Sequence, residues 1–385
     1  MDSIVAQIQA LAQNADEAGR LDIIQSLKRV KNELQSPKDT LIELAVPGLT
    51  SATLRISADL GLFRSLASSD VPLAIPKIAE LTGASPPLLE RILRYLASMD
   101  LIKETGVNEY TANNITHALA DPKGEAMIYH VFDTMQPVLY AMPDFFAENN
   151  YQDVTVDTNT PFQKAHNTTL SSFKWLVQQP KNFENLQKIM TALQGSEWTE
   201  GFNLFNDEAQ KISSAAPQPS EKPFFVDVGG GYGHQCIELG KKYPNLLGHL
   251  VLQDLPEAVG NIAPIDGVKT AVHDFFQPQP ITGAKFYYLR RIMHDWSDEQ
   301  ATQILRNIRA AMAPDSRILI DETVLPDTGA NWQSTVADLA MMMFAGKERT
   351  KHQWDSLAES AGLRVEQIHS YVASTYTAVL VLAAQ

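Results

Sequence analysis

The stretch that most constrains this chain is residues 224–240, FFVDVGGGYGHQCIELG. An apolar run leads into four glycines within five residues, and a helical pattern follows. Glycine lets the backbone adopt tight turn conformations and approach a ligand with no Cβ in between. The order predicts a ligand site at the first strand–helix turn of an open α/β sheet, although a purely structural turn would also use such a loop.

The remainder of the C-terminal part is typical of such a sheet. Helical patterns such as DEQATQILRNIRAAM follow most of the apolar runs HLVLQDL, KTAVHDF, KFYYLRRI and SRILIDETV. This alternation indicates a doubly wound parallel sheet. The final YVASTYTAVLVLAA predicts two further strands that form an edge hairpin. We therefore assign residues 224–385 to a Rossmann-like α/β domain.

The preceding residues predict a mainly helical region. Within residues 52–105, SPPLLERILRYLASMDLI opens with a serine N-cap and prolines in the first turn. IKETGVNEYTAN then predicts a hairpin, and this order is that of a winged helix. Residues 1–120 would form this winged-helix-like domain, and the apolar faces within 1–45 need either their own core or a second subunit. Residues 121–205 would be a helical connecting region, and the aperiodic residues 206–223 a linker loop.

Composition excludes several classes of protein. The net charge of −14 disfavours nucleic-acid binding, for which Arg91 and Arg94 of the winged helix would be a poor phosphate clamp. The sequence contains no run of 18 apolar residues, so no transmembrane helix is predicted. The single cysteine, Cys236, leaves no internal disulfide and fits a reducing, cytosolic environment.

Acidic side chains at the strand ends indicate the kind of ligand. Asp254 ends the second strand at the spacing at which an acid reaches ribose hydroxyls. Asp274 ends the third strand before Phe275, and Asp227 lies in the first strand. Each of these aspartates alone is more often a cap or turn residue. Together their negative charges disfavour a pyrophosphate ligand, and the sequence has no G-x-x-x-x-G-K-[ST] motif for binding one. S-adenosylmethionine, a cationic nucleoside without phosphate, fits this ring of acids.

Six ordered motifs resemble a known family: DVGGGYG, LQDLPEAV, HDFF, RRIMHDWSDEQ, DETVLP and GKERT. They occur in the order found in the caffeic-acid-type O-methyltransferases of plants and their fungal relatives. The resemblance covers most of the chain and includes a winged-helix-like dimerisation domain. It implies a class I methyltransferase fold, a homodimer, and S-adenosylmethionine-dependent methylation of a hydroxyl on a small aromatic or polyketide-like secondary metabolite.

The resemblance also implies roles for individual residues. His294 would be the general base, flanked by Glu322 and Glu348. Arg290 stands where the plant enzymes usually have a lysine, so the charge is kept and the shape differs. The full set of residues implied for cofactor binding is Asp227, Gly229, Gly231, Asp254, Leu255, Asp274, Phe275 and Arg290.

The chemistry supports these roles independently. In-line methyl transfer needs an aligned oxyanion, and a phenol is mostly protonated at pH 7. A neutral imidazole oriented by a third group can take that proton. An alternative is that His294 merely starts a helix, although Ser297 or Asp298 would cap that helix better. Likewise, Glu322 could be an ordinary acid at a strand end, and Glu348 could be a solvated acid.

The aromatic residues and methionines could line a substrate pocket for a flat aromatic molecule. Such residues are often simply part of the core, so their pattern does not by itself indicate a pocket. No metal is expected, since the nine histidines show no ligand-like pairing. The alternative function is a rearrangement or pericyclic step in which bound S-adenosylmethionine is not consumed. The pocket candidates are His130, Met135, Trp175, Phe183, Met190, Asp295, Met341 and Met342.

Overall fold

The computed structural model describes residues 2–190, 195–212, 222–260 and 262–385. The chain divides into two compact units, which we describe separately. The sheet unit comprises Met1–Gln25, Gln152–Thr160 and Gln194–Gln385, and the helical unit comprises Ser26–Tyr151 and Pro161–Leu193.

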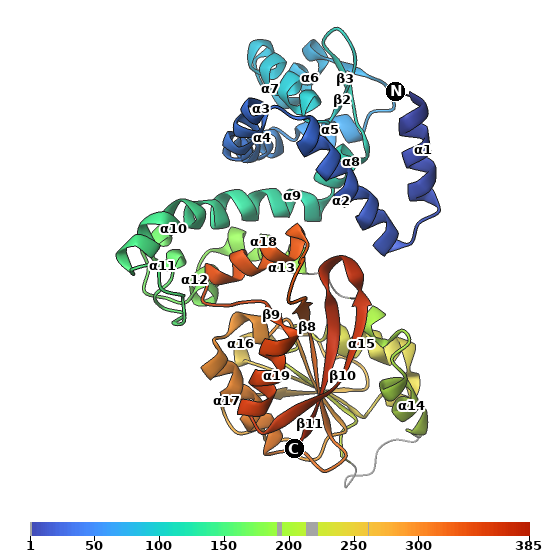
Figure 1. Ribbon diagram of the computed structural model, residues 1–385, viewed down its shortest axis with the longest axis vertical. Helices are drawn as coiled ribbons and strands as arrows, with labels where there is room; N and C mark the ends of the chain where they lie inside the picture. Colours follow the sequence, from blue (N-terminus) through green and yellow to red (C-terminus); the bar gives the residue numbers. More distant parts are fainter. Residues whose placement is uncertain (1, 191–194, 213–221, 261) are drawn as a thin grey trace. The chain divides into compact units, whose positions relative to one another are not determined.

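The sheet unit is built on a mostly parallel sheet with strand order β10-β11-β8-β7-β4-β5-β6 (Figure 1). Its parallel strands are β4 (Phe225–Val228), β5 (Leu250–Asp254), β6 (Val268–Val272), β7 (Phe286–Arg290) and β8 (Arg317–Leu325). The short β9 (Arg349–Thr350) also pairs with β8. The hairpin of β10 (Leu363–Val372) and β11 (Thr377–Ala384) adds two antiparallel strands, and its first strand begins earlier than the sequence predicts. The predicted doubly wound sheet with an edge hairpin is confirmed.

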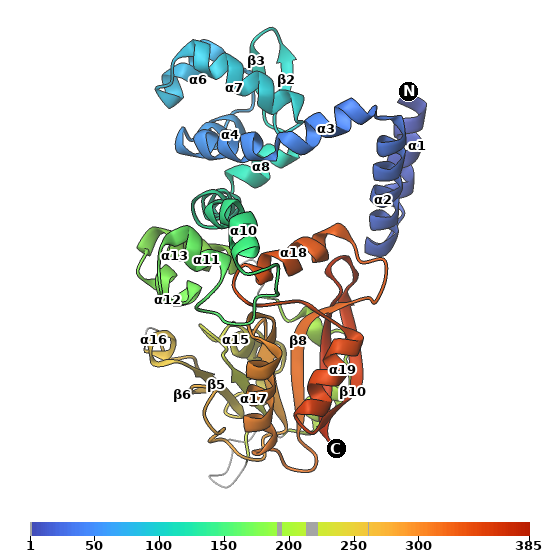
Figure 2. The ribbon, with the colours of Figure 1, turned by 60° about the vertical axis from the view of Figure 1, so that its left-hand side comes forward.

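Helices pack on both faces of this sheet because alternate strand residues are apolar on both sides. On one face, α17 (Asp298–Arg309) and α19 (Lys351–Ser360) cover a core that includes Val226 and Tyr287. On the other face, α14 (Asn203–Lys211) and α15 (His234–Lys242) cover a core that includes Phe225 and Tyr288. Figures 1 and 2 show these two helical layers with the sheet between them. The remaining described helices that lie wholly in this unit are α1 (Asp2–Gln13), α16 (Pro256–Val259), α18 (Trp332–Met342) and the short turns η3 (Glu197–Thr199), η4 (Pro244–Leu246), η5 (Met293–Asp295) and η6 (Ala373–Thr375).

Helix α14 corrects the prediction of a linker over residues 206–223. Residues 206–211 are helical, and Ala209 is completely buried together with Phe205. The apolar spacing of this helix begins before residue 206, so the segment taken alone has no visible period. Residues 213–221 of the predicted linker lie outside the described residues.

The helical unit contains the predicted winged-helix order. Helices α4 (Pro47–Asp59), α5 (Leu62–Ala67), α6 (Ile75–Thr82) and α7 (Pro86–Ser98) are followed by the hairpin of β2 (Lys103–Gly106) and β3 (Glu109–Thr111). Strand β1 (Leu73–Ala74) completes a small antiparallel sheet with β3. Gly83 ends α6 in the left-handed conformation, at φ +71°.

Helices precede and follow this winged-helix part. Before it lie α1 (Asp2–Gln13), α2 (Glu17–Leu34) and α3 (Pro37–Ala45). After it come α8 (Asn114–Ala120), α9 (Pro122–Tyr129), the π-helix η1 (His130–Met135), α10 (Gln136–Glu148), α11 (Pro161–His166), α12 (Ser172–Val177) and α13 (Pro180–Met190). Among the described residues, none of the helices has the length and apolarity to span a bilayer.

Candidate active site

His294 lies on a short turn that follows β7. Arg291 takes a left-handed conformation, at φ +52°, and directs the chain into η5. Ser297 then caps α17 by accepting a hydrogen bond from the Gln300 amide. His294 is therefore not the cap of this helix, so its side chain is available for another purpose.

Hydrogen bonds from two distant segments fix this turn. Oε1 of Glu322 accepts from the backbone amides of Met293 at 2.9 Å and of His294 at 3.3 Å. The fully buried guanidinium of Arg349 donates through Nη1 to the Met293 carbonyl and through Nη2 to the Trp296 carbonyl, both at 2.8 Å. A bidentate donor of this kind sets orientation as well as position.

The imidazole of His294 faces carboxylates through both of its nitrogens. Its Nδ1 lies 3.1 Å from Oε1 of Glu348 and 3.5 Å from Oε2 of Glu322. Its Nε2 lies 3.6 Å from Oδ1 of Asp295. The side chains of Glu322 and Glu348 are 0% and 2% exposed, whereas that of Asp295 is 53% exposed. The three residues expected to form the catalytic centre are thus neighbours in space.

This arrangement changes the acidity of the ring. Burial alone would lower the pKa of His294, but the negative charges of Glu322, Asp295 and Glu348 outweigh it and raise the pKa to about 10. Burial raises the pKa of Glu322, while the bond to His294 and its charge outweigh burial at Glu348 and lower its pKa. At pH 7 the ring is an imidazolium, in contrast to the neutral imidazole that a simple general base requires.

The same three side chains could also surround a cation, since one ligand atom of each lies within 4.8 Å of the others. The hydrogen bond between Nδ1 and Glu348 already accounts for their closeness. The expectation that no metal is used stays a prediction.

The glycine loop is tied to the end of β5. Gly229, Gly231 and Gly233 have φ values of +72°, +58° and +76°, which favour glycine. The Gly231 amide donates to Oδ2 of Asp254 at 2.7 Å, and the Leu255 amide donates to Oδ1 of the same carboxylate at 2.7 Å. Asp254 therefore holds the loop in place, and burial raises its pKa.

The two sides of the loop differ. On the inner side, a Cβ on Gly230 would lie 2.4 Å from the Asp227 carboxylate, which is 1% exposed. Burial and the nearby Asp254 raise the pKa of Asp227 to about 7. At Gly231 a Cβ would meet nothing within 4 Å. Asp227 thus packs against the buried side of the loop at Gly230, and the open side of the loop is at Gly231.

The loop directly adjoins the turn that carries His294. A Cβ on Gly229 would lie 2.8 Å from Cδ1 of Ile292 and 3.4 Å from a ring atom of Phe275. Phe275 in turn packs edge-on against Trp296, with ring centroids 5.9 Å apart. The glycine loop and the turn that carries His294 are therefore neighbours in space.

Asp274 and Arg290, both predicted to bind the cofactor, lie in positions that the sequence did not predict. β6 ends at Val272, so Asp274 lies two residues beyond the strand rather than at its end, where its Oδ1 accepts from the Phe276 amide. The Nη1 of Arg290 donates to the Gly195 carbonyl at 2.9 Å, and its Nε lies 3.5 Å from Oδ2 of the buried Asp321. Arg290 thus ties the end of β7 to a neighbouring segment.

These features fit the predicted cofactor. The open glycine backbone at Gly231 leaves room for a ligand, and the carboxylate of Asp254 stands beside it. Phe275 adds an aromatic surface against the loop. An acid at a strand end and an aromatic ring suit a nucleoside with a cationic centre better than a phosphate.

Comparisons with known proteins agree with this geometry. Residues 152–364 match an O-methyltransferase domain, and residues 43–121 match an O-methyltransferase dimerisation domain. The chain is 41% identical to demethylsterigmatocystin 6-O-methyltransferase of Aspergillus flavus over 96% of its own length and 95% of that protein. The chain belongs to the S-adenosylmethionine-dependent O-methyltransferase family.

A second relative is also named an O-methyltransferase, whereas one similar solved structure is described by a different chemistry. The protein is 40% identical to O-methyltransferase LepI of Aspergillus flavus, over 100% of this chain and 99% of that one. The solved structure of LepI in complex with S-adenosylmethionine superposes with a TM-score of 0.89, at 37% identity and covering 100% of this chain and 98% of LepI. A structure described as a pericyclic reaction enzyme has a TM-score of 0.88 at 37% identity, covering 100% of this chain and 99% of that one.

The pocket candidates of this O-methyltransferase are divided between the two units. Asp295, Met341 and Met342 belong to the sheet unit, and the other five belong to the helical unit. There, His130 opens the π-helix η1, and its Nδ1 has no hydrogen-bond partner among the described residues. Trp175 packs against His166, with ring centroids 4.3 Å apart. Whether these residues contact a substrate stays a prediction.

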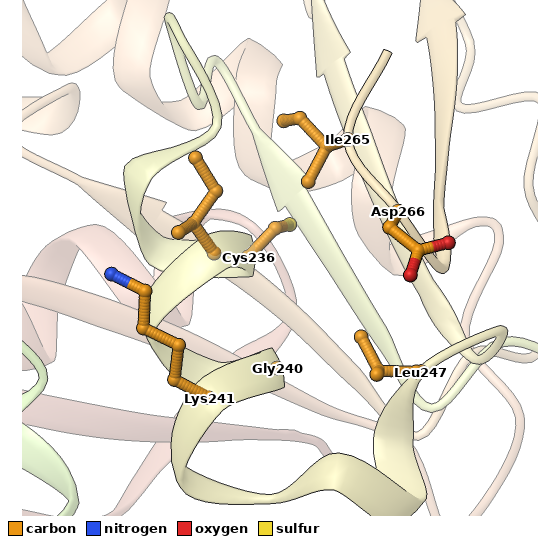
Figure 3. A pocket seen from close by; sticks show the side chains of 7 residues that line it. Cys236, Gly240, Lys241, Leu247, Ile265 and Asp266 are labelled. Carbon is orange, nitrogen blue, oxygen red and sulfur yellow. The ribbon is translucent and has the colours of Figure 1, made fainter.

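A separate hollow of about 250 Å³ opens beside α15 (Figure 3). It is bordered by α15, by Leu247 after η4 and by the segment before β6. None of the predicted site residues lines it. Its lining residues are Cys236, Ile237, Gly240, Lys241, Leu247, Ile265 and Asp266.

Sequence reasoning missed Arg349 as a member of the site. It stands next to Glu348 in GKERT and reads as a solvated charge, yet it is completely buried. The signal that could have indicated it is the three-residue N-cap spacing from Thr350 to Gln353, which places Arg349 just before a helix start rather than in a free loop.

Proposed function

We propose that this protein transfers a methyl group from S-adenosylmethionine to a hydroxyl of a small aromatic or polyketide-like secondary metabolite. The observation that carries the proposal is the His294 centre, held between Glu322 and Glu348 and adjoining the glycine loop through Ile292. The relative that is named for methylation of demethylsterigmatocystin supports an aromatic polyketide as the acceptor class.

The chain's own residues would divide the binding task. Gly229 and Gly231 offer an open backbone, while Asp254 and Leu255 offer a carboxylate and an exposed apolar side chain. Asp274 and Phe275 would hold the base of the nucleoside. Asp227 and Arg290 would act by supporting the loop and the end of β7. The bound cofactor supplies an electrophilic methyl group on a sulfonium.

The His294 centre would then prepare the acceptor. The methyl acceptor is an oxygen whose proton must leave as the new bond forms. Glu322 and Glu348 hold the ring on its Nδ1 side, which leaves Nε2 as the nitrogen that faces an acceptor. The turn around His294 is fixed by Arg349 and Glu322, so the ring is positioned before a substrate arrives.

We also propose a cytosolic homodimer in which residues 1–120 form the dimerisation domain, residues 121–205 the connecting region and residues 224–385 the cofactor-binding domain. The match to a dimerisation domain supports the dimer. Helices α2 and α3 bury none of their residues, and their exposed apolar side chains need a partner surface. These side chains include Ile24, Leu27, Val30, Leu34, Leu41 and Leu44.

Mass spectrometry with a panel of aromatic hydroxyl compounds tests this function. The panel would begin with demethylsterigmatocystin, and each reaction would be followed for a methylated product and for S-adenosylhomocysteine in equal amounts. Methylation of any panel member that requires S-adenosylmethionine supports the proposal. Product formation without S-adenosylhomocysteine contradicts it.

The second candidate is a rearrangement in which S-adenosylmethionine binds and is not consumed. Two observations favour it: the likeness to the structure described as a pericyclic reaction enzyme, and the raised pKa of His294. An imidazolium donates hydrogen bonds and can polarise a substrate carbonyl without taking a proton. Conversion of a substrate in which the methyl group stays on sulfur would favour this candidate.

A further inference from the structure

Gln253 places a polar side chain in the buried part of β5. It is 0% exposed, and on this strand it shares a face with Val251, which belongs to the core beneath α17 and α19. An amide buried without hydrogen-bond partners is costly, and an apolar residue would satisfy packing at this position. The glutamine therefore needs partners that justify its burial.

The partner is Gln279, which is 6% exposed and lies in the segment between β6 and β7. Nε2 of Gln253 donates to Oε1 of Gln279 at 2.9 Å, and Nε2 of Gln279 donates to Oε1 of Gln253 at 2.8 Å. Oε1 of Gln279 also accepts from the Ile281 amide at 3.1 Å. Two hydrogen bonds between the same two planar groups fix their relative orientation as well as their distance.

Residues 273–281, which we call the base loop, carry Asp274 and Phe275, the residues proposed to hold the base of the nucleoside. The ring of Phe275 approaches the glycine loop closely, since a Cβ on Gly229 would lie 3.4 Å from it. The position of the base loop against the glycine loop therefore sets the space that a nucleoside would enter.

The base loop is attached to β5 at both of its ends. At its start, the His273 amide donates to the Asp254 carbonyl at 2.9 Å. Near its end, Gln279 pairs with Gln253. A single attachment would let the loop pivot about β5, whereas two attachments fix its tilt. Between them, Nδ2 of Asn307 in α17 donates to the Phe275 carbonyl at 3.0 Å.

Gln253 also holds the glycine loop through its backbone. Its carbonyl accepts from the amides of Gly229 at 2.8 Å and of Gly230 at 3.1 Å. One residue thus contacts the glycine loop with its main chain and the base loop with its side chain, and the next residue is Asp254.

We infer that the amide pair of Gln253 and Gln279 positions the base loop against the glycine loop and thereby sets the affinity for S-adenosylmethionine. This inference rests on the cofactor contacts proposed above for Asp254 and Phe275. It adds two positioning residues that act through those contacts, by holding the two sides of the nucleoside site at a fixed separation before the cofactor binds.

The test uses Gln253→Leu, Gln279→Leu and the double variant of the full-length protein. Calorimetry measures S-adenosylhomocysteine binding, and thermal unfolding is followed without ligand. Each single variant leaves a buried amide without its partner, so the unfolding temperature should fall by about 2 °C or more. The dissociation constant should rise about tenfold, because the base loop is no longer held in place. Gln277→Leu changes an exposed glutamine of the same loop and should match wild type in both measurements.

The double variant separates positioning from stability. It leaves neither glutamine amide unpaired, so its unfolding temperature should exceed that of Gln279→Leu by about 2 °C or more. Its dissociation constant should stay about tenfold above that of wild type, because two leucines form no directed bond. With an acceptor that wild type methylates, KM for S-adenosylmethionine should rise to a similar extent, while kcat at saturation stays within about threefold of wild type.

Wild-type affinity in all three variants would overturn the inference, and so would an affinity that recovers together with the unfolding temperature or a loss confined to kcat. These results would leave the proposed methyl transfer standing. Because binding is measured without an acceptor, the calorimetric result does not depend on whether a methyl group is transferred. A wild-type protein that binds no S-adenosylhomocysteine would overturn the proposed function and this inference together.

Discussion

The Nδ1 atom of His294 lies 3.1 Å from Oε1 of Glu348, a residue 54 positions further along the chain. The two residues lie in different segments of the chain, because His294 follows β7 and Glu348 follows α18. Glu322, at the same ring nitrogen, comes from β8, the strand next to β7. Two buried acids thus hold one cation, and breaking such a set by removing one member is costly.

Replacing Glu348 by Gln removes one of these charges and keeps the shape. The pKa of His294 should fall, because one of the carboxylates that raises it is gone. We expect kcat to fall about 10–100-fold, part of what general acid–base help usually contributes. Affinity for S-adenosylhomocysteine should stay the same. Steady-state kinetics and calorimetry measure both quantities, and Glu359→Gln, at the exposed end of α19, serves as the control. An unchanged kcat would show that this carboxylate does not act on the ring.

The protonation of His294 should make stability depend on pH. The folded pKa of about 10 lies above the ordinary value of 6.5, so the ring binds its proton more tightly in the folded state. This contribution is complete below about pH 6.5 and is lost as the pH rises through about 10, by at most about 1.4 kcal/mol per pH unit. The difference in unfolding temperature between wild type and His294→Gln should therefore shrink from pH 7 to pH 10. A difference that does not vary with pH contradicts the raised pKa.

Asp254→Asn tests the bond between the glycine loop and β5. An asparagine offers one oxygen to the two amides of Gly231 and Leu255 that the carboxylate now satisfies. One amide would lose its partner, at about 1–3 kcal/mol, and the charge beside the ligand would vanish. Calorimetry should show an affinity for S-adenosylhomocysteine weaker by about tenfold or more, while Asp266→Asn, an exposed acid outside the site, should bind normally. Equal binding by both variants would remove Asp254 from the cofactor site.

Arg349→Lys tests whether the turn around His294 needs its bidentate donor. Lysine keeps the charge but cannot reach both the Met293 and Trp296 carbonyls in the same way. We expect kcat to fall about tenfold or more and the unfolding free energy to fall by about 1–3 kcal/mol. Lys351→Met breaks an exposed ion pair with Asp355 and should cost about 1 kcal/mol or less. If Arg349→Lys is as mild as this control, the guanidinium does not position His294.

Much of the fold was predictable because its signals are local. The strands alternate with amphipathic helices, and the loop glycines do require positive φ. The grouping of His294, Glu322 and Glu348 was predictable from the ordered motifs, because a family resemblance that fixes three residues in the sequence also implies where they lie in the fold. Residues 206–211 were misjudged because the helix that contains them starts outside the segment.

The sequence did not predict which charged side chains are buried. Asp227 was expected beside the cofactor and lies beneath the loop, since only the folded backbone shows which side of Gly230 its carboxylate occupies. Arg349 reads as a surface charge, and its burial depends on carbonyls from a turn more than fifty residues earlier. The protonation of His294 likewise depends on acids that only tertiary packing brings together.

The central claim is that this protein moves the methyl group through the His294 centre. The most direct measurement follows an isotope-labelled methyl of S-adenosylmethionine in wild type and in His294→Gln, with demethylsterigmatocystin and related aromatic hydroxyl compounds as acceptors. We predict that wild type places one label on the product for each S-adenosylhomocysteine formed, and that His294→Gln binds the cofactor normally and loses about 10²-fold or more of this transfer. A converted substrate that carries no label, or an undiminished transfer by His294→Gln, would contradict the account.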